Sequence, residues 1–231
     1  MLFRQLFDSE SSTYTYLLAD PLSRESVLID PVLNKTEDYL SLLEQLELRL
    51  AYAIDTHVHA DHVTALGKLR EDAGCVTVMG RETGADCVSQ KISDGQELNF
   101  GDGRLRAIYT PGHTDDSYSF YDAAGGRVFT GDTLLIRGTG RTDFQNGDPF
   151  AQYASLFEKL LRLPAETLVY PAHDYRGWTV STIAEERRWN PRLQAASAED
   201  YAQIMNNLNL PNPKMMDVAV PANQRCGRPP A

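Results

Sequence analysis

The segment THVHADH at residues 56–62 constrains this chain more than any other feature. It holds three of the five histidines, with an aspartate between the second and the third. The others are His113 in TPGHTDDS and His173 in YPAHDYRG. A lone histidine is usually a core or surface residue with a satisfied hydrogen bond, but all five here follow the end of a predicted strand. Imidazoles with carboxylates at strand ends indicate a site for zinc, iron, manganese or a similar ion.

The hydrophobic pattern predicts an α/β protein in which strands and then helices occur twice, giving two sheets with helices on their outer faces. Strands are expected at 2–7, 13–19, 26–30, 48–55, 75–79, 96–100, 104–110, 117–122, 127–131 and 167–170. Helices are expected at 36–47, 64–74, 149–162, 181–188 and 198–207. We expect Thr36 to cap the first helix, Gly74 to end the second, and Asp61 and His62 to lie at the start of that second helix. A domain over 1–210 and an irregular tail over 211–231, packed on it, complete the expectation.

Composition narrows the class of protein. The net charge of −10 argues against nucleic acid as a partner, because neutralising phosphates needs a basic surface. The three cysteines predict no disulfide framework, which fits a reducing compartment. No apolar run reaches the roughly 18 residues that span a bilayer. The first residues lack the features of a signal or transit peptide, so we expect a cytoplasmic protein, bacterial or a processed mature form.

The histidines occur with a further aspartate, Asp132 in FTGDTLL, and together they resemble the metallo-β-lactamase superfamily. Its pattern is H-x-H-x-D-H, then a histidine, an aspartate and a last histidine. The matching residues, in chain order, are His57, His59, Asp61, His62, His113, Asp132 and His173. The resemblance implies an αββα sandwich, two mixed β-sheets flanked by helices, with the metal at one edge on loops that follow strand ends. No cysteine accompanies the cluster, so a thiolate-rich structural zinc site is not expected.

Three further segments are similar to the persulfide dioxygenases, also called sulfur dioxygenases. They are GDTLLIRGTGRTDFQNGDP, PAHDYRGWTVSTIAEERRWNPRL and NLNLPNPKMMDVAVPANQRCG. This resemblance implies oxidation of glutathione persulfide by dioxygen to sulfite and glutathione at one Fe(II) per chain. It assigns the metal to His57, His113 and Asp132, which leaves positions open for substrate and dioxygen.

The same resemblance assigns the other four residues of the histidine and aspartate pattern to roles around the iron. We expect them to orient the ligands or to hold water, and we expect Tyr175 to donate a hydrogen bond to substrate or oxygen, unless it is only a packed aromatic. These catalytic candidates are His59, Asp61, His62, His173 and Tyr175. Spacing alone leaves one metal or two open, since the four residues besides Tyr175 are those that a binuclear hydrolase uses for a second metal.

Glutathione carries two carboxylates, so the substrate pocket needs a cation. Arg141 is the first candidate, because a guanidinium grips a carboxylate with two hydrogen bonds. The alternative is a salt bridge that ties its own loop, to Asp143 or Asp174. Asn223 and Arg225 are weaker candidates that depend on the tail folding back over the site. Cys226 is expected to be a buried, inert thiol in preference to a reactive one.

Two other functions fit parts of the pattern. A hydroxyacylglutathione hydrolase (glyoxalase II) would use a binuclear site and a metal-bound hydroxide on a thioester, but it carries a longer helical C-terminal domain. A non-catalytic metal-binding or sensor protein would not need all seven pattern positions. Besides the small-molecule substrate and dioxygen we expect no nucleic acid, no membrane and, from the resemblance, a homodimer.

Overall fold

Short apolar segments build a first sheet from the N-terminal part of the chain. In the computed structural model, which describes residues 1–211 and 215–228, its strands are adjacent in chain order. They are β1 (Leu2–Asp8), β2 (Thr13–Ala19), β3 (Glu25–Ile29), β4 (Arg49–Ile54), β5 (Val76–Gly80) and β6 (Gln90–Ile92). β1 to β3 pair antiparallel and β3 to β6 pair parallel. The carboxyl ends of β3 and β4 therefore meet at one edge of this sheet.

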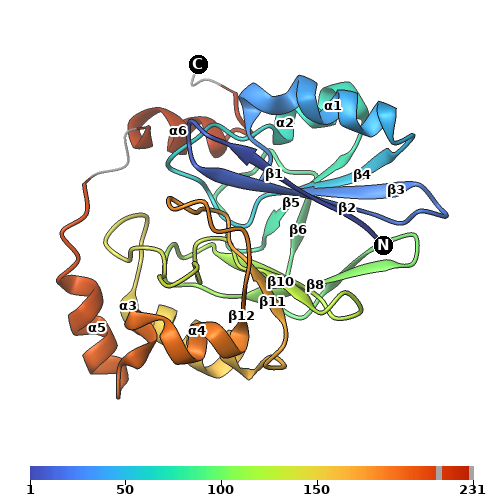
Figure 1. Cartoon of the computed structure of the whole chain (residues 1–231). Helices are drawn as coiled ribbons and strands as arrows, with labels where there is room; N and C mark the ends of the chain where they lie inside the picture. Colours follow the sequence, from blue (N-terminus) through green and yellow to red (C-terminus); the bar gives the residue numbers. More distant parts are fainter. Residues whose placement is uncertain (212–214, 229–231) are drawn as a thin grey trace. The chain divides into compact units, whose positions relative to one another are not determined.

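Two helices cover this sheet because each has one apolar face. Tyr39 and Leu43 of α1 (Thr36–Gln45) and Leu66 and Leu69 of α2 (Leu66–Ala73) pack in one buried cluster with strand residues such as Leu50. Figure 1 shows both helices along the same side of the strands. The turn η1 (Leu33–Lys35) precedes α1.

Two local expectations for these helices were wrong. The cap position of α1 is Lys35, because the Thr36 hydroxyl donates to the carbonyl of Leu33 instead. Asp61 and His62 lie in bends before α2, which begins only at Leu66. The predicted end of α2 is confirmed: Gly74 adopts φ of 68° and its N–H bonds to the Arg70 carbonyl, a conformation that glycine adopts without steric cost.

A second mixed sheet follows, in the spatial order β12-β11-β10-β9-β8-β7. Its strands are β7 (Glu97–Phe100), β8 (Gly103–Tyr109), β9 (Tyr118–Asp122), β10 (Arg127–Phe129), β11 (Leu168–Tyr170) and β12 (Ser181–Thr182). β10 and β11 pair parallel, whereas β8 with β9, β9 with β10, and β11 with β12 pair antiparallel. β6 and β12 were not predicted, because three and two residues are too few to show a period.

The helices of this part are α3 (Pro149–Ala154), α4 (Ile183–Trp189) and α5 (Ala198–Asn206). α3 continues through a π-helical turn, η2 (Ser155–Lys159), and a 3-10 turn, η3 (Leu160–Arg162), so the predicted helical span 149–162 is confirmed. η4 (Pro191–Gln194) follows α4. Leu156, Leu160, Ile183 and Tyr201 pack with Val128 and Val169 of the sheet. The expected fold class, two mixed β-sheets flanked by helices, is confirmed (Figure 1).

The chain groups into two compact units. The first comprises residues 1–92 and 97–104 with the described residues after Lys214, and the second comprises 93–96 and 105–211. The division into a domain 1–210 and a tail remains a prediction, but the segment is not irregular throughout: α6 (Met216–Asn223) lies within it, in the first unit. Residues 212–214 and 229–231 of the predicted tail lie outside the described residues.

The cysteines differ from expectation. Cys87 and Cys226 form a disulfide across a sequence separation of 139 residues, so Cys226 is neither a free reactive thiol nor a free buried one. Cys75 is a buried thiol. Sequence spacing could not reveal the pairing, since only the fold brings the two Cα atoms to 5.9 Å.

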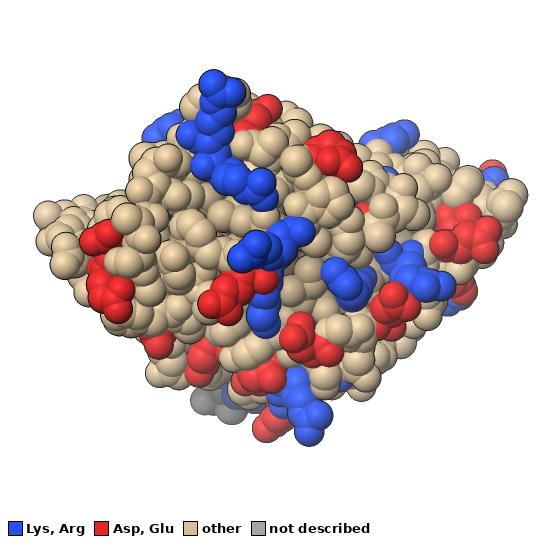
Figure 2. Space-filling view, turned by 90° about the horizontal axis from the view of Figure 1, so that it is seen from below, with Lys and Arg blue, Asp and Glu red and all other residues tan. Residues whose placement is uncertain are grey.

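Two surface properties bear on partners. Within residues 1–211 and 215–228, no helix is long and apolar enough to cross a membrane. On the face drawn in Figure 2, basic and acidic side chains of the described residues are interspersed, and neither sign forms a broad patch there.

Candidate metal centre

The first unit presents its histidines on the loop between β4 and α2. His57, His59 and His62 are buried, and Asp61 is about a quarter exposed. One ligand atom from each of His59, Asp61 and His62 lies within 4.8 Å of the others. The strand ends at Ile54, so the loop leaves the sheet at the edge where β3 also ends.

Asp30 organises this loop, and sequence reasoning missed it. It follows β3 with φ of 53°, and its carboxylate accepts hydrogen bonds from the Thr56 backbone (2.7 Å), the Thr56 hydroxyl (3.1 Å) and His59 Nε2 (3.1 Å). The Thr15 hydroxyl donates to its carbonyl. The available signal was an aspartate directly after a strand that runs parallel to the strand before THVHADH.

This network selects the ligand nitrogen of His57. The Thr56 hydroxyl donates to Asp30, so its oxygen can accept the Nδ1–H of His57 at 3.0 Å. Nε2 is then the nitrogen with the lone pair, the form in which imidazole binds a metal.

His59 and His62 are each held by a carboxylate. Burial disfavours the charged form of His59, but the Asp30 charge and hydrogen bond outweigh it and raise the pKa of His59 to about 9. His62 Nδ1 lies 2.8 Å from Asp61 Oδ2 and 3.3 Å from the Thr13 hydroxyl. These contacts fix the orientation of both rings.

The second unit places His113, Asp132 and His173 together, each after the end of a strand. His173 Nδ1 lies 2.7 Å from Asp132 Oδ1, and His113 Nε2 lies 3.6 Å from Asp132 Oδ2. His113 Nδ1 donates to the Arg141 carbonyl at 2.8 Å, which makes Nε2 the acceptor nitrogen. One carboxylate thus faces two imidazoles, and one of those imidazoles has its tautomer fixed by backbone.

The loop that carries Arg141 passes very close to this cluster. At Gly140 a Cβ atom would lie 2.4 Å from the Asp132 carbonyl oxygen and 2.7 Å from His113 Nδ1. The Gly140 N–H also bonds to the Asp132 carbonyl at 2.6 Å. Only glycine fits such a close approach, which explains why a glycine precedes Arg141 in the GTGR sequence.

The Arg141 guanidinium is engaged within its own unit. It makes two hydrogen bonds to Asp143, of 2.6 and 2.7 Å, and one to the Pro211 carbonyl at 2.7 Å. The hydrogen bond from Arg141 is the main cause that lowers the pKa of Asp143. The loop-tying salt bridge to Asp143 is therefore present, and a role in substrate binding remains a prediction.

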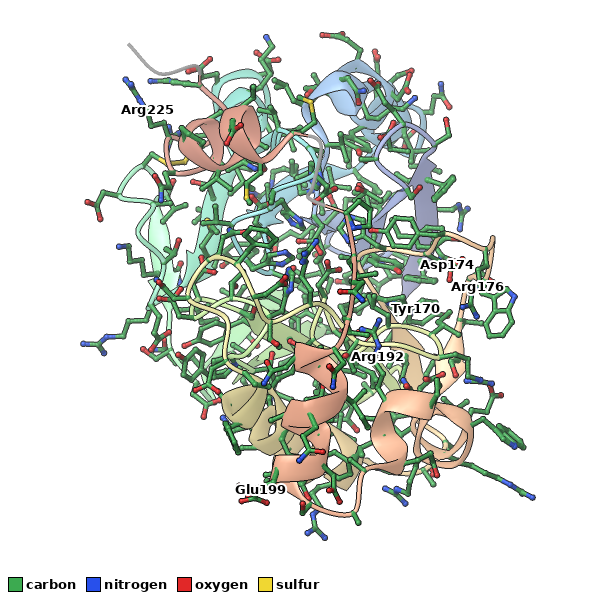
Figure 3. The ribbon with its side chains drawn as sticks, turned by 90° about the vertical axis from the view of Figure 1, so that its left-hand side faces the viewer. Tyr170, Asp174, Arg176, Arg192, Glu199 and Arg225 are labelled. Atoms are coloured by element: carbon green, nitrogen blue, oxygen red, sulfur yellow. A yellow bond between two sulfur atoms is a disulfide. The ribbon has the colours of Figure 1, made fainter. Side chains whose placement is uncertain are left out.

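Tyr175 and Asp174 lie in the loop after β11. Tyr175 is 71% exposed and its ring stacks on His173 with 6.2 Å between centroids. Asp174 accepts from the backbone N–H groups of Arg176 (2.8 Å) and Trp178 (2.7 Å), so it shapes the loop (Figure 3). Tyr175 is thus placed beside the cluster with its ring accessible.

The two C-terminal candidates differ from each other. Asn223 is 2% exposed, and its side chain bonds the backbone of residues 59–64. Arg225 is exposed and extends outward beside α6 (Figure 3). Substrate contacts by these residues remain predictions.

Known proteins resemble this chain over nearly its whole length. A family model described as the metallo-beta-lactamase superfamily matches residues 9–87 and 88–173, which include all five histidines. The mitochondrial persulfide dioxygenase ETHE1 of Homo sapiens is 50% identical over 228 residues, covering 98% of this chain and 89% of the human protein.

Solved structures show the same similarity at the level of the fold. The crystal structure of ETHE1 from Myxococcus xanthus is 54% identical, with a TM-score of 0.96, and the match covers 99% of this chain and 100% of that chain. A structure of TTHA1623 in a di-iron-bound form is 29% identical with a TM-score of 0.69, covering 81% of this chain and 98% of that one. The similarity in fold therefore extends to relatives of lower identity.

Proposed function

Because the chain belongs to the metallo-β-lactamase superfamily and, within it, to the persulfide dioxygenase family, we propose that it oxidises glutathione persulfide at one ferrous ion. The chain is an enzyme, a persulfide dioxygenase. With dioxygen and water the products are sulfite and glutathione. The observation that carries this function is 50% identity to a persulfide dioxygenase across 98% of the chain.

The proposed ligands are His57, His113 and Asp132. Their chemistry fits iron: two imidazoles, each with Nε2 as the acceptor nitrogen, and one carboxylate make the set found in non-haem ferrous oxygenases. Bound there, the ion would supply a Lewis acid and an electron source for the reaction between sulfur and dioxygen.

The chain's own residues would set up this reaction by orientation. His173 holds Asp132 through a 2.7 Å hydrogen bond, and the Arg141 carbonyl holds His113. Outer partners of this kind fix ligand orientation and raise ligand basicity. Tyr175 is proposed to donate a hydrogen bond to the substrate. Arg141 is proposed to bind a glutathione carboxylate with the donor capacity that Asp143 and the carbonyls of Leu210 and Pro211 do not take.

His59, Asp61 and His62 are proposed to orient the ligand loop or hold water, and not to bind a second metal. The matched relatives support the dioxygenase over the hydrolase alternative, glyoxalase II. The di-iron relative makes metal stoichiometry worth measuring directly.

The deciding experiment pairs a metal count with two assays on protein purified without oxygen. We expect one iron per chain, and one dioxygen consumed for each sulfite formed from glutathione persulfide. Two metals per chain with hydrolysis of a glutathione thioester and no oxygen uptake would refute the proposal.

Location and assembly stay predictions. A cytoplasmic location was expected from the sequence, whereas the human relative is named as mitochondrial. Fractionation of the source cells and sedimentation of the purified protein would test the location and the expected homodimer.

A further inference from the structure

Asn223 joins the C-terminal segment to the metal-binding loop with every hydrogen-bonding atom of its side chain. Nδ2 donates to the carbonyls of His59 (2.9 Å) and His62 (2.8 Å), and Oδ1 accepts from the Thr64 N–H (2.8 Å). Two carbonyls on one side and an N–H on the other fix which amide atom is oxygen. The residue is 2% exposed, so these bonds are not replaced by water without opening the segment.

The segment around Asn223 also contacts residues 64–67, just after the metal-binding loop, at two more points. The Gly67 N–H donates to the Cys226 carbonyl at 2.9 Å, and a Cβ on Gly67 would lie 2.4 Å from that oxygen. A Cβ on Gly227, which has φ of 84°, would lie 2.1 Å from the Thr64 carbonyl oxygen. Glycine on each side of the contact therefore permits the approach.

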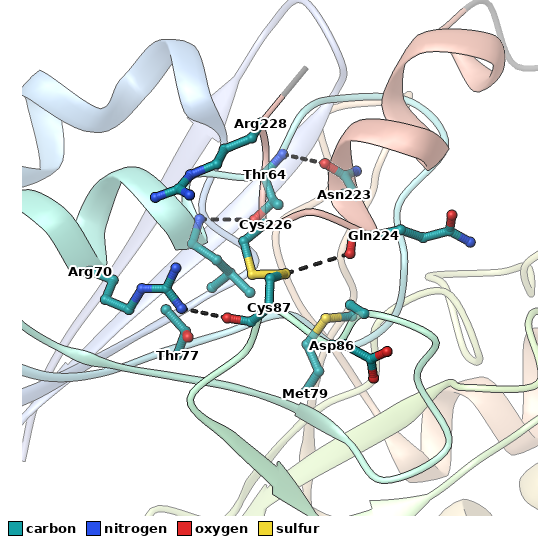
Figure 4. The surroundings of a disulfide bond; sticks show 12 residues. Thr64, Arg70, Thr77, Met79, Asp86, Cys87, Asn223, Gln224, Cys226 and Arg228 are labelled. Carbon is teal, nitrogen blue, oxygen red and sulfur yellow. Dashed lines mark hydrogen bonds between the residues drawn. A yellow bond between two sulfur atoms is a disulfide. The ribbon is translucent and has the colours of Figure 1, made fainter. Parts of the chain in front are cut away.

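A covalent bond fastens this contact. Cys226 is joined to Cys87, whose carbonyl accepts a hydrogen bond from the Arg70 guanidinium on α2 (Figure 4). Thr64 bonds to Asn223, Gly67 to Cys226 and Arg70 to Cys87. All three follow the histidine loop directly in sequence. The disulfide limits how far Asn223 can move from its three partners.

We propose that Asn223 is a positioning residue that sets the conformation of the metal-binding loop, and that the Cys87–Cys226 disulfide holds it in place. In this role it acts through the backbone of residues 59–64, in place of the substrate contact expected from the sequence. The inference rests on the proposed function only for the identity of the metal bound through His57.

The first test measures metal affinity of the full-length protein in the absence of persulfide. Asn223→Asp keeps the side-chain shape but turns an oxygen toward two carbonyls, and we expect Fe(II) affinity to fall roughly 10–100-fold, as for other outer partners of metal ligands. The absorption bands of the Co(II)-substituted protein should shift, since they report ligand geometry. Gln224→Ala is the matched control, because the neighbouring side chain is exposed, and it should leave both unchanged.

Two outcomes of this test overturn the proposal. One is unchanged Fe(II) affinity and an unchanged Co(II) spectrum in a folded Asn223→Asp protein. The other is the same result with a raised KM for glutathione persulfide, which would make Asn223 a substrate contact. Because affinity and spectrum need no turnover, failure of the proposed reaction leaves this test readable.

The second test keeps Asn223 and removes its fastening. Cys226→Ser and Cys87→Ser each break the disulfide with a nearly isosteric change, and we expect faster Fe(II) dissociation and a shifted Co(II) spectrum in both. This arm stands even where Asn223→Asp does not fold. Dissociation at the wild-type rate in both folded serine variants would show that the disulfide does not hold Asn223.

Discussion

At the scale of single residues, hydrogen bonds decide which imidazole nitrogen can meet a metal. Thr56 holds Nδ1 of His57 and the Arg141 carbonyl holds Nδ1 of His113. Neither partner is charged, and both act by fixing a tautomer. Asp132 is the one carboxylate of the proposed set and is oriented by His173.

The substitution Asp132→Asn tests the carboxylate. It keeps the shape but removes the negative charge, so bound iron should fall by more than the roughly 10–100-fold typical of outer partners. Asp174→Asn is the control, because Asp174 bonds backbone N–H groups of its own loop. The iron bound per chain is measured after equilibration with limiting Fe(II). A wild-type iron content in Asp132→Asn would show that Asp132 is not a ligand.

The Arg141 guanidinium offers a second residue-scale prediction. Arg141→Lys removes the guanidinium donor proposed to bind the substrate carboxylate beside the Asp143 pair, and hydrogen bonds to charged groups contribute about 1.5–3 kcal/mol, so KM for glutathione persulfide should rise roughly tenfold or more. Iron content should stay at the wild-type value, because only the carbonyl of Arg141 contacts His113. An unchanged KM would leave Arg141 with the loop-tying role alone, and Arg188→Lys, on the exposed part of α4, serves as control.

The three cysteines should differ in their reactivity toward an alkylating reagent. Burial raises the pKa of Cys75 to about 11, so the folded protein holds this proton more tightly than the unfolded chain. The stability linked to Cys75 is intact below the unfolded pKa and is lost as pH rises through the alkaline range. At pH 8 we expect no alkylation of the folded oxidised protein, one modified cysteine after unfolding without reductant, and three with reductant. Mass spectrometry counts them, and an alkylated Cys87 without reductant would contradict the disulfide.

At the scale of elements, α4 holds the loop that follows the proposed ligand Asp132. Glu186 on α4 is fully buried and accepts from the Arg137 backbone and guanidinium, from Ser181 and from Asn190. Its neighbour Glu185 also pairs with Arg137, but its side chain is 41% exposed. The same arginine therefore has one buried and one surface partner.

This pair predicts unequal losses of stability. Glu186→Ala leaves buried donors without their acceptor and should lower the free energy of unfolding by about 3–5 kcal/mol. Glu185→Ala removes a solvated pair and should cost about 0–1 kcal/mol. Denaturant titrations followed by circular dichroism compare the two, and equal losses would mean that burial does not set the strength of this contact.

At the scale of the whole molecule, the fold was more predictable than its details. Strand and helix patterns predicted two sheets with helices on their outer faces, and they predicted that every histidine follows the end of a strand, because those signals are local or fixed by topology. Asp30, the disulfide and the bonds of Asn223 were not predictable, because each depends on residues distant in sequence. α6 was missed because Pro221 and nearby proline and asparagine residues favour irregular chain, and packing in the first unit overrides that preference.

Metal loading should stabilise the chain as a whole. A ligand that binds only the folded state adds about 2.7 kcal/mol at a concentration 100 times its Kd. Saturating Fe(II) under argon should raise the Tm of wild-type apoprotein, and Asp132→Asn should lose most of that rise. Equal shifts in the two proteins, measured by scanning calorimetry, would place the stabilising ion elsewhere.

The bond between Cys87 and Cys226 closes a covalent ring that contains the entire second unit in its sequence. A protease that nicks any peptide bond between these positions opens the ring without releasing a fragment. Nicked molecules should therefore migrate as one species on a non-reducing gel and separate into two bands only after thiol treatment. After a single cleavage in that stretch, the disulfide therefore keeps both fragments in one covalent molecule.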